Sequence, residues 1–256
     1  MTLDDGKKER KTRSDKGLIM ATRRDLYCLA WIAEQYAARA DQIQRLLSRF
    51  PDSDKPFKDE LIAETTTRDQ IARWKRAGWI EYQRVLADEP GYAWVTKKGL
   101  ALVDLDDVYT ARAPASTRLS HIYAVNQLRL WMDVKFAWKS ERRYRSEQTT
   151  MLKKGEVLGP IPDGLIRTKD GIFAIEAEIS PKKPAVLLDK LARLVRASGF
   201  NLENSRYGLT FPAIWFYVPN ESMKKLVEVV IEELLEDEQE RVSVAIEQDL
   251  IASRFR

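Results

Sequence analysis

The stretch 162–182 constrains the fold of this chain more than any other part of the sequence. Asp163 opens a short apolar run, a turn signal (Lys-Asp-Gly) follows at 169–171, and a second apolar run carries Glu176 and Glu178. Two apolar runs joined through an Asp-Gly turn are typical of a β-hairpin. Because strand side chains alternate between faces, Glu176 and Glu178 point to one face, and pairing across the turn brings Asp163 to the same end. The sequence therefore predicts a hairpin with three carboxylates gathered at one end.

These three acids have the chemistry of a metal site. Asp163, Glu176 and Glu178 offer hard oxygen ligands of the kind that Mg²⁺ (or Mn²⁺) takes when it acts on phosphate esters. Lys182, expected at the start of the following helix, supplies an ammonium that offsets charge on the reacting phosphate. Acids on exposed strand faces are common, so a solvated hairpin face without function is the alternative interpretation.

The first half of the chain predicts a different kind of module. Apolar residues recur at helical spacing, Thr65-Thr66-Thr67 offers an N-cap, and Gly78 is a helix-stop signal after inward-facing Ile71 and Trp74. The expected elements are helices at 22–37, 40–50 and 67–77, strands at 79–86 and 92–96, and a helix that opens at 97. Three helices, a two-stranded ribbon and a helix are the order of a winged helix-turn-helix domain, which we assign to residues 22–105.

Basic and amide side chains gather on the third helix and beside the ribbon. Arginine and glutamine suit base edges, and lysine and arginine suit phosphates, so double-stranded DNA is the expected partner. The candidate DNA-binding residues are Thr67, Arg68, Gln70, Arg73, Arg76, Arg84, Lys97 and Lys98. A protein-binding winged helix with a solvated charged face is the alternative.

Charge and composition agree with this division. Residues 1–150 hold 28 Lys and Arg against 22 Asp and Glu, whereas residues 151–256 hold 15 against 17. Residues 1–21 are expected to form a disordered basic tail. No apolar run reaches the ~18 residues that span a bilayer, and the charged N-terminus does not look like a secretory leader. The single cysteine, Cys28, favours a reducing compartment, so we expect a cytoplasmic protein with no membrane partner.

The second half predicts an α/β domain over residues 118–256, after a polar boundary at 104–117. The expected elements are a buried helix at 118–136, a strand-like segment at 140–151, the acidic hairpin, a helix at 184–197, a strand at 213–218 and a long helix at 221–248. This order matches a restriction-endonuclease-like core, whose motif runs Pro-Asp and then Asp/Glu-x-Lys. The predicted fold class is therefore α+β, a winged helix followed by a domain of the PD-(D/E)xK type.

The chain as a whole resembles the replication-relaxation family of mobile elements. It is also similar to plasmid mobilisation relaxases that join a winged helix to a restriction-endonuclease-like domain. The residues that carry the resemblance are Trp94-Val95-Thr96-x-x-Gly99, Leu119-Ser120-His121, Pro162-Asp163-Gly164-Leu165-Ile166 and Ile175-Glu176-Ala177-Glu178-Ile179-Ser180-Pro181-Lys182. The resemblance implies a Mg²⁺-dependent nickase or relaxase of plasmid replication or mobilisation, with relaxosome or replication proteins as partners. One departure matters, because Glu178 holds the place of the motif's lysine.

Two function classes therefore stay open. The first is a metal-dependent DNA nickase, and the second is a non-catalytic DNA-binding regulator or relaxosome accessory protein with a degenerate nuclease fold. His121, the only histidine, falls in an apolar stripe with Val125, Leu128 and Met132. A core role is the expected one for it, and acid–base catalysis requires that this helix end open into the acidic cleft. Homodimerisation through the last helix is also open.

Overall fold

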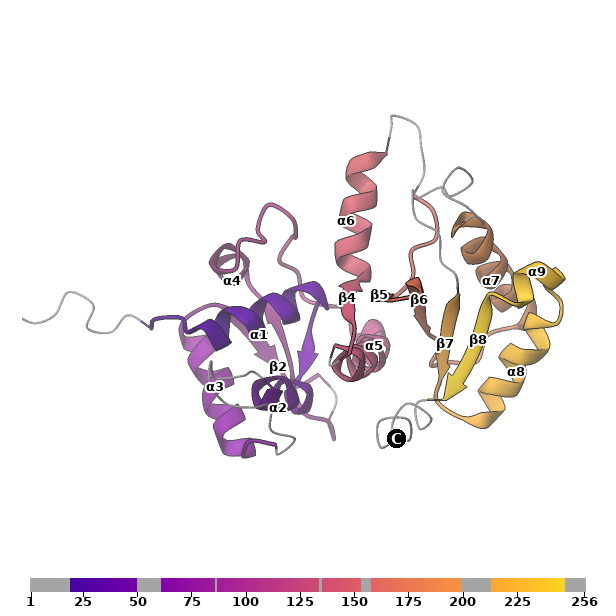
Figure 1. The fold of residues 1–256 in the computed structure, drawn as a ribbon. Coiled ribbons are helices and arrows are strands. Elements are labelled where there is room, and N and C mark those ends of the chain that lie inside the picture. The colour runs from indigo at the N-terminus through magenta and orange to yellow at the C-terminus, as the bar shows by residue number, and fades with distance from the viewer. Residues whose placement is uncertain are drawn as a thin grey trace, which may run out of the picture.

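A computed structural model of the protein describes residues 19–49, 61–85, 87–133, 135–152, 158–198 and 213–246. Almost all of the predicted tail, 1–18, lies outside these residues. The described chain is α+β and contains a three-stranded and a five-stranded sheet. Figure 1 shows the three-stranded half in indigo to magenta and the five-stranded half in pink to yellow, with helix α5 between them.

The first half contains the predicted three helices, ribbon and further helix. Its elements are α1 (Arg23–Glu34), β1 (Ala38–Arg39), α2 (Ala40–Arg49), α3 (Glu64–Arg76), β2 (Ile80–Gln83), β3 (Tyr92–Val95) and α4 (Lys97–Leu102). The strands pair antiparallel in the order β1-β3-β2. Ile71 and Trp74 are buried as predicted, and Gly78 ends α3 with φ +73°. Cys28 is fully buried in this core.

The third helix starts earlier than predicted. Its N-cap is Ala63, so Thr67 lies inside the helix and not at its end. Thr67 is 3% exposed, and its hydroxyl donates to the Ala63 carbonyl at 3.4 Å. The prediction that Thr67 contacts DNA is therefore wrong, because the side chain bonds its own helix backbone instead.

Thr96 and Gly99 of the sequence Trp94-Val95-Thr96-x-x-Gly99 fix how α4 packs against the end of α3. The Thr96 hydroxyl accepts from the Gly99 amide at 3.1 Å and donates to the Gly78 carbonyl at 2.7 Å, so it caps α4 and ties it to the end of α3. A Cβ on Gly99 would lie 2.0 Å from the carbonyl oxygen of Trp79. Only glycine allows this close approach of α4 to the chain that enters the ribbon.

The second half is a mixed sheet between helices. Its elements are a 3₁₀ turn (Ser116–Arg118), α5 (Leu119–Met132), β4 (Ala137–Ser140), α6 (Glu141–Met151), β5 (Gly164–Thr168), β6 (Gly171–Ala177), α7 (Pro184–Ser198), β7 (Ile214–Val218), α8 (Glu221–Ile231), α9 (Glu236–Gln239) and β8 (Val242–Ile246). The strand order is β4-β5-β6-β7-β8, antiparallel from β4 to β6 and parallel from β6 to β8. Helices α7 and α8 cover one face and α5 the other.

The predicted hairpin is confirmed, and two other predictions for this half are wrong. Strands β5 and β6 pair from Gly164↔Ile175 to Thr168↔Gly171. Residues 141–151 form a helix and not a strand, because Ser140 caps it and Tyr144 is buried one turn later. The long helix expected at 221–248 is instead α8, α9 and β8. Within this stretch, Glu238 is 3% exposed and pairs with Arg196 at 2.7 Å.

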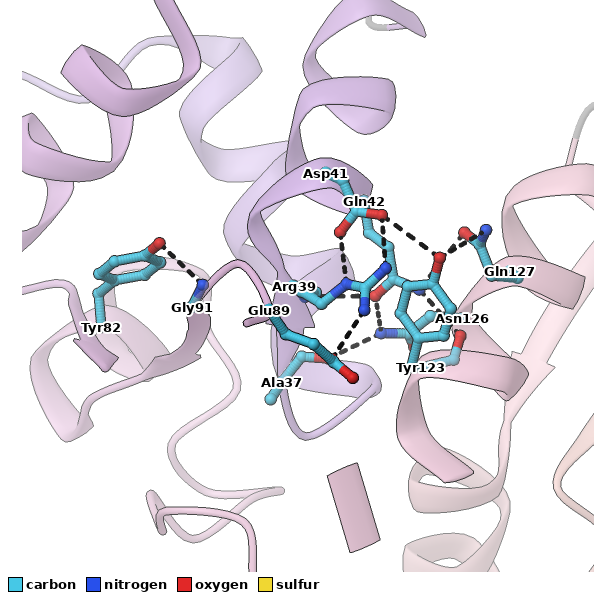
Figure 2. A network of polar contacts seen from close by, with 10 residues as sticks. All are labelled: Ala37, Arg39, Asp41, Gln42, Tyr82, Glu89, Gly91, Tyr123, Asn126 and Gln127. Carbon is cyan, nitrogen blue, oxygen red and sulfur yellow. Dashed lines mark hydrogen bonds and ion pairs between the residues drawn. The ribbon is translucent and has the colours of Figure 1, made fainter. Parts of the chain in front are cut away.

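Helix α5 is shared by the two halves. Ile122 packs with Ala37 and Tyr92 of the first half, whereas Val125 and Leu128 pack against the five-stranded sheet. Figure 2 shows the polar contacts that accompany this packing. Two hydrogen bonds cross to α5, from Asn126 Nδ2 to the Ala37 carbonyl (2.8 Å) and from Gln42 Nε2 to the Tyr123 carbonyl (2.8 Å). The Arg39 guanidinium lies 3.7 Å from the centre of the Tyr123 ring. It also forms ion pairs with Asp41 (2.7 Å) and Glu89 (2.8 Å).

A buried carboxylate holds α1 against α3. Asp25 closes a capping box with Thr22 and also accepts from Gln70 (2.7 Å), Arg73 (2.9 Å) and Trp74 (2.8 Å). Burial alone would raise the pKa of Asp25, but the hydrogen bonds from Arg73, Thr22 and Trp74 outweigh it and lower that pKa to about 2. The carboxylate is therefore charged in the folded protein at neutral pH.

We expect Asp25→Ala to lower the free energy of unfolding by about 3 kcal/mol at pH 7, because it leaves a partly buried guanidinium without its partner. A folded pKa of about 2 means that the contribution of Asp25 is complete above about pH 4 and is lost as the pH falls through 2. Urea denaturation measures both effects, with exposed Asp69→Ala as the control. Equal losses in the two variants would show that the network contributes nothing.

Candidate functional site

The hairpin brings Asp163 and Glu176 together at one end of the sheet. Asp163 directly precedes β5, and the pairing of Gly164 with Ile175 places it beside the end of β6. One Asp163 oxygen, Oδ2, accepts from the backbone amide of Ala177 at 2.9 Å. The Glu176 side chain lies within hydrogen-bonding reach of Asp163 and is only 2% exposed. Of the three acids predicted to gather here, Asp163 and Glu176 lie within reach of each other, whereas Glu178 pairs with lysines.

A lysine on α7 completes the acidic cluster. Glu176 and Glu178 both face α7, as the period of two predicts. Lys190 Nζ lies 2.7 Å from Glu176 Oε2 and 3.4 Å from Glu178 Oε2. Lys182 also pairs with Glu178, but it lies in the loop before α7 and not at the start of the helix. The lysine next to the contacting pair of acids is therefore Lys190.

Burial and repulsion separate the pKa values of these groups. Burial and the nearby charge of Asp163 raise the pKa of Glu176 to about 8, against the opposing effect of Lys190. Burial would also raise the pKa of Asp163, but His121, Lys190 and the Ala177 amide lower it below its usual value. Burial would lower the pKa of Lys190, yet Glu176, Asp163 and Glu178 raise it. At neutral pH the cluster holds a charged Asp163, a largely protonated Glu176 and an ammonium.

His121 belongs to this cluster and not to the apolar core. Its Nε2 lies 2.8 Å from Asp163 Oδ1, and its side chain is 30% exposed. Burial would lower the pKa of His121, but the hydrogen bond and charge of Asp163 raise it. Val125, Leu128 and Met132, which share its helical stripe, are buried as predicted. The start of α5 therefore contacts the acidic cluster through His121.

The donor set fits a divalent cation in part. Within the described residues, no group of three or more histidine, cysteine, aspartate or glutamate side chains is placed to hold a metal ion. Asp163 and Glu176 contact each other, whereas Glu178 is engaged by two lysines. Two carboxylates in mutual contact are a fit for Mg²⁺, which is commonly bound through one or two carboxylates plus water. The third predicted ligand, Glu178, acts here as an anchor for Lys182 and Lys190.

The predicted DNA-binding residues divide into three groups. Arg68, Arg76, Arg84 and Lys97 are exposed. Three others are engaged within the protein. Gln70 and Arg73 donate hydrogen bonds to Asp25, and the Lys98 ammonium donates to the Ala77 carbonyl at 2.8 Å, although Lys98 is exposed to solvent. Thr67 is buried. The exposed basic set is thus smaller than the sequence indicated.

Acidic residues line the groove between α3 and the ribbon. This groove, of about 360 Å³, contains Arg68 and Arg84 together with Asp41, Glu64, Asp88 and Glu89. Its excess of carboxylates repels phosphate. Outside this groove, Lys75 and Arg76 are exposed on α3.

Lys190 was not predicted, because it lies 12 and 14 positions after the acids that it contacts, whereas Lys182 is close to them along the chain. One signal points to it. Lys190 lies between Leu187 and Leu194 on the buried stripe of α7, where a lysine is out of place unless it meets a buried acid. The link from His121 to Asp163 spans 42 positions and has no local signal.

Comparisons of the chain with family models, with curated proteins and with solved structures found no match. Within the described residues, none of the helices has the length and apolar character that crossing a membrane requires. The resemblance stated above therefore stays a prediction, and function has to be argued from the geometry.

The raised pKa of Glu176 makes stability depend on pH. The folded state keeps the Glu176 proton up to about pH 8, whereas the unfolded chain releases it near 4.5, so this contribution is complete below pH 4.5 and lost as the pH rises to about 8. We expect the melting temperature of the wild type to fall relative to Glu176→Gln across this window and to level off above it. Exposed Glu81→Gln is the control. A constant difference between wild type and Glu176→Gln from pH 5 to 9 would contradict the shift.

Proposed function

We propose that this protein is a Mg²⁺-dependent DNA endonuclease, a nickase that cuts one strand, with its first half acting as a winged helix on double-stranded DNA. One observation carries the proposal. The half-buried Asp163 and the buried Glu176 lie in contact at the end of a hairpin, with the Lys190 ammonium 2.7 Å from Glu176. Two carboxylates in contact repel each other when both are charged, and a divalent cation held between them would relieve that repulsion.

The division of labour follows from the contacts. Bound Mg²⁺ supplies Lewis-acid stabilisation of charge on the phosphate. Asp163 and Glu176 would hold the ion, since their mutual repulsion is relieved by a cation or by a proton. Lys190 keeps positive charge beside Glu176 and would offset charge that develops on the phosphate. His121 fixes the orientation of Asp163 through the 2.8 Å contact.

The arrangement of elements supports the same proposal. An antiparallel hairpin with a Pro-Asp start leads through α7 to a parallel strand, β7, which is the expected order of a restriction-endonuclease-like core. In the first half, α3 precedes an antiparallel ribbon and the Thr96–Gly99 cap, as in a winged helix. A fold alone does not establish catalysis, so the carboxylate pair carries the argument.

A non-catalytic DNA-binding protein is the second candidate, and one observation favours it. Each acid of the cluster already has a basic partner: His121 for Asp163, Lys190 for Glu176, and Lys182 with Lys190 for Glu178. Such a set of ion pairs needs no metal to be stable. In this case the cluster maintains the fold, and the protein serves as a regulator or an accessory of a relaxosome.

Metal binding and nicking separate the two candidates. We expect Mn²⁺ to raise the melting temperature of the wild type, since a ligand at one hundred times its dissociation constant stabilises by about 2.7 kcal/mol. Glu176→Gln should lose this gain and the nicking of supercoiled plasmid. Lys190→Met should lose nicking, because the ammonium near the phosphate is gone.

Exposed Lys183→Met is the matched control for Lys190→Met and should nick as the wild type does. If the wild type and Glu176→Gln respond to Mn²⁺ alike and neither nicks, the nuclease proposal fails and the DNA-binding candidate remains.

DNA binding is tested on the exposed basic residues of α3 that lie outside the acidic groove. We expect Lys75→Ala with Arg76→Ala to weaken binding and to reduce the slope of log affinity against log salt by about one unit per charge removed. Fluorescence anisotropy with a labelled duplex measures the slope. Arg193→Ala, on the exposed face of α7, is the control. Arg73 is unsuitable, because its loss would destabilise the fold through Asp25. An unchanged slope in the double variant would remove α3 from the interface.

A further inference from the structure

A small crevice lies where the end of α1 meets the start of α5, next to Asp163. Its volume is about 20 Å³, which is room for about one water molecule. The residues that line it are Gln35, Tyr36, Arg118, His121, Ile122, Val125, Asn126, Glu141 and Asp163. The crevice thus joins the first half of the molecule to the acidic cluster.

Two buried polar groups in this crevice have no hydrogen-bond partner in the protein. Gln35 is 4% exposed and its Nε2 is unpaired, and Asn126 is fully buried with its Oδ1 unpaired. The Asn126 amide group already donates to the Ala37 carbonyl and to Gln42, so only its oxygen is left over. One group is a donor and the other an acceptor. A buried polar group without a partner is costly, and a water molecule satisfies both kinds at once.

The imidazole of His121 lines the same crevice. Its Nε2 is engaged by Asp163 Oδ1, and within the described residues its Nδ1 has no hydrogen bond to protein. The unpaired groups of Gln35 and Asn126 belong to residues that line the same crevice as the ring.

The backbone holds Gln35 at this point firmly. The Ala37 amide donates to the Gln35 carbonyl at 2.8 Å across Tyr36, whose φ of +67° is rare for a residue with a large side chain. The guanidinium groups of Arg118 and Arg142 lie 5.0 and 4.9 Å from the Tyr36 ring centre and hold the turn in place.

We propose that an ordered water molecule binds Gln35 Nε2 and Asn126 Oδ1 and hydrogen-bonds the ring of His121. Gln35 is then a positioning residue. It belongs to the first half, yet through this water and His121 it orients Asp163 in the second. The water link stands apart from the proposed nuclease activity, and only its effect on metal binding rests on that activity.

The test compares Gln35→Leu with exposed Gln83→Leu, both in the full-length protein. A crystal structure of the wild type, at a resolution that reveals ordered water, should show electron density for a water molecule within hydrogen-bonding distance of Gln35 Nε2 and Asn126 Oδ1. Because His121 is the only histidine, long-range ¹H–¹⁵N spectra report on one imidazole without overlap. Gln35→Leu should shift its Nδ1 resonance, whereas Gln83→Leu should leave it in place.

A crevice without density, or an imidazole spectrum unchanged by Gln35→Leu, overturns the proposal. Neither readout needs nicking, so an inactive wild type would remove the proposed function and leave the water link standing. If the wild type nicks, Gln35→Leu should reduce its Mn²⁺ affinity by roughly tenfold, as loss of a group that orients a metal ligand does. An unreduced affinity in a nicking protein would remove Gln35 from the positioning role.

Discussion

The contact between Asp163 and Glu176 at the end of β6 is the interaction on which the rest of the site depends. One carboxylate is half-buried and the other buried, and they repel each other when both are charged unless a cation lies nearby. The surrounding groups reduce this repulsion. Lys190 comes from α7, His121 comes from α5, and a proton stays on Glu176 to a pH well above its usual range. The helices on the two faces of the sheet are therefore fixed by charge as well as by apolar packing.

Glu178 has different neighbours from Glu176, although both side chains face α7. Glu178 lies just beyond the end of β6, where its amide still donates to the Tyr217 carbonyl at 2.9 Å. At that position it meets two ammonium groups and no second acid. It is thus a salt-bridge partner, and its excess negative charge is neutralised locally. Two acids that look equivalent in the sequence differ because only one of them is next to Asp163.

Local signals in the sequence predicted the hairpin, the three helices of the first half and the meeting of Asp163 with Glu176. Turn chemistry and a period of two depend only on neighbouring residues, so they can be read directly. The helix at 141–151, predicted as a strand, also has a local signal, a serine cap followed by Glu141. The error at 221–248 is of another kind. Leucine, valine and glutamate there favour a continuous helix, but β8 forms because its backbone pairs with β7, and no local pattern encodes that pairing.

Helix α5 also limits how this protein can be divided. Its Ile122 completes a cluster with Ala37 and Tyr92, while its Val125 and Leu128 complete the packing on the sheet. A chain cut at 104–117 would leave one side of this helix uncovered and the first half without part of its apolar wall. Each half therefore depends on α5 for part of its apolar packing. A recombination event that joined the second half to a new first half would have to bring along a matching surface for α5, so the two halves are expected to be inherited as one unit.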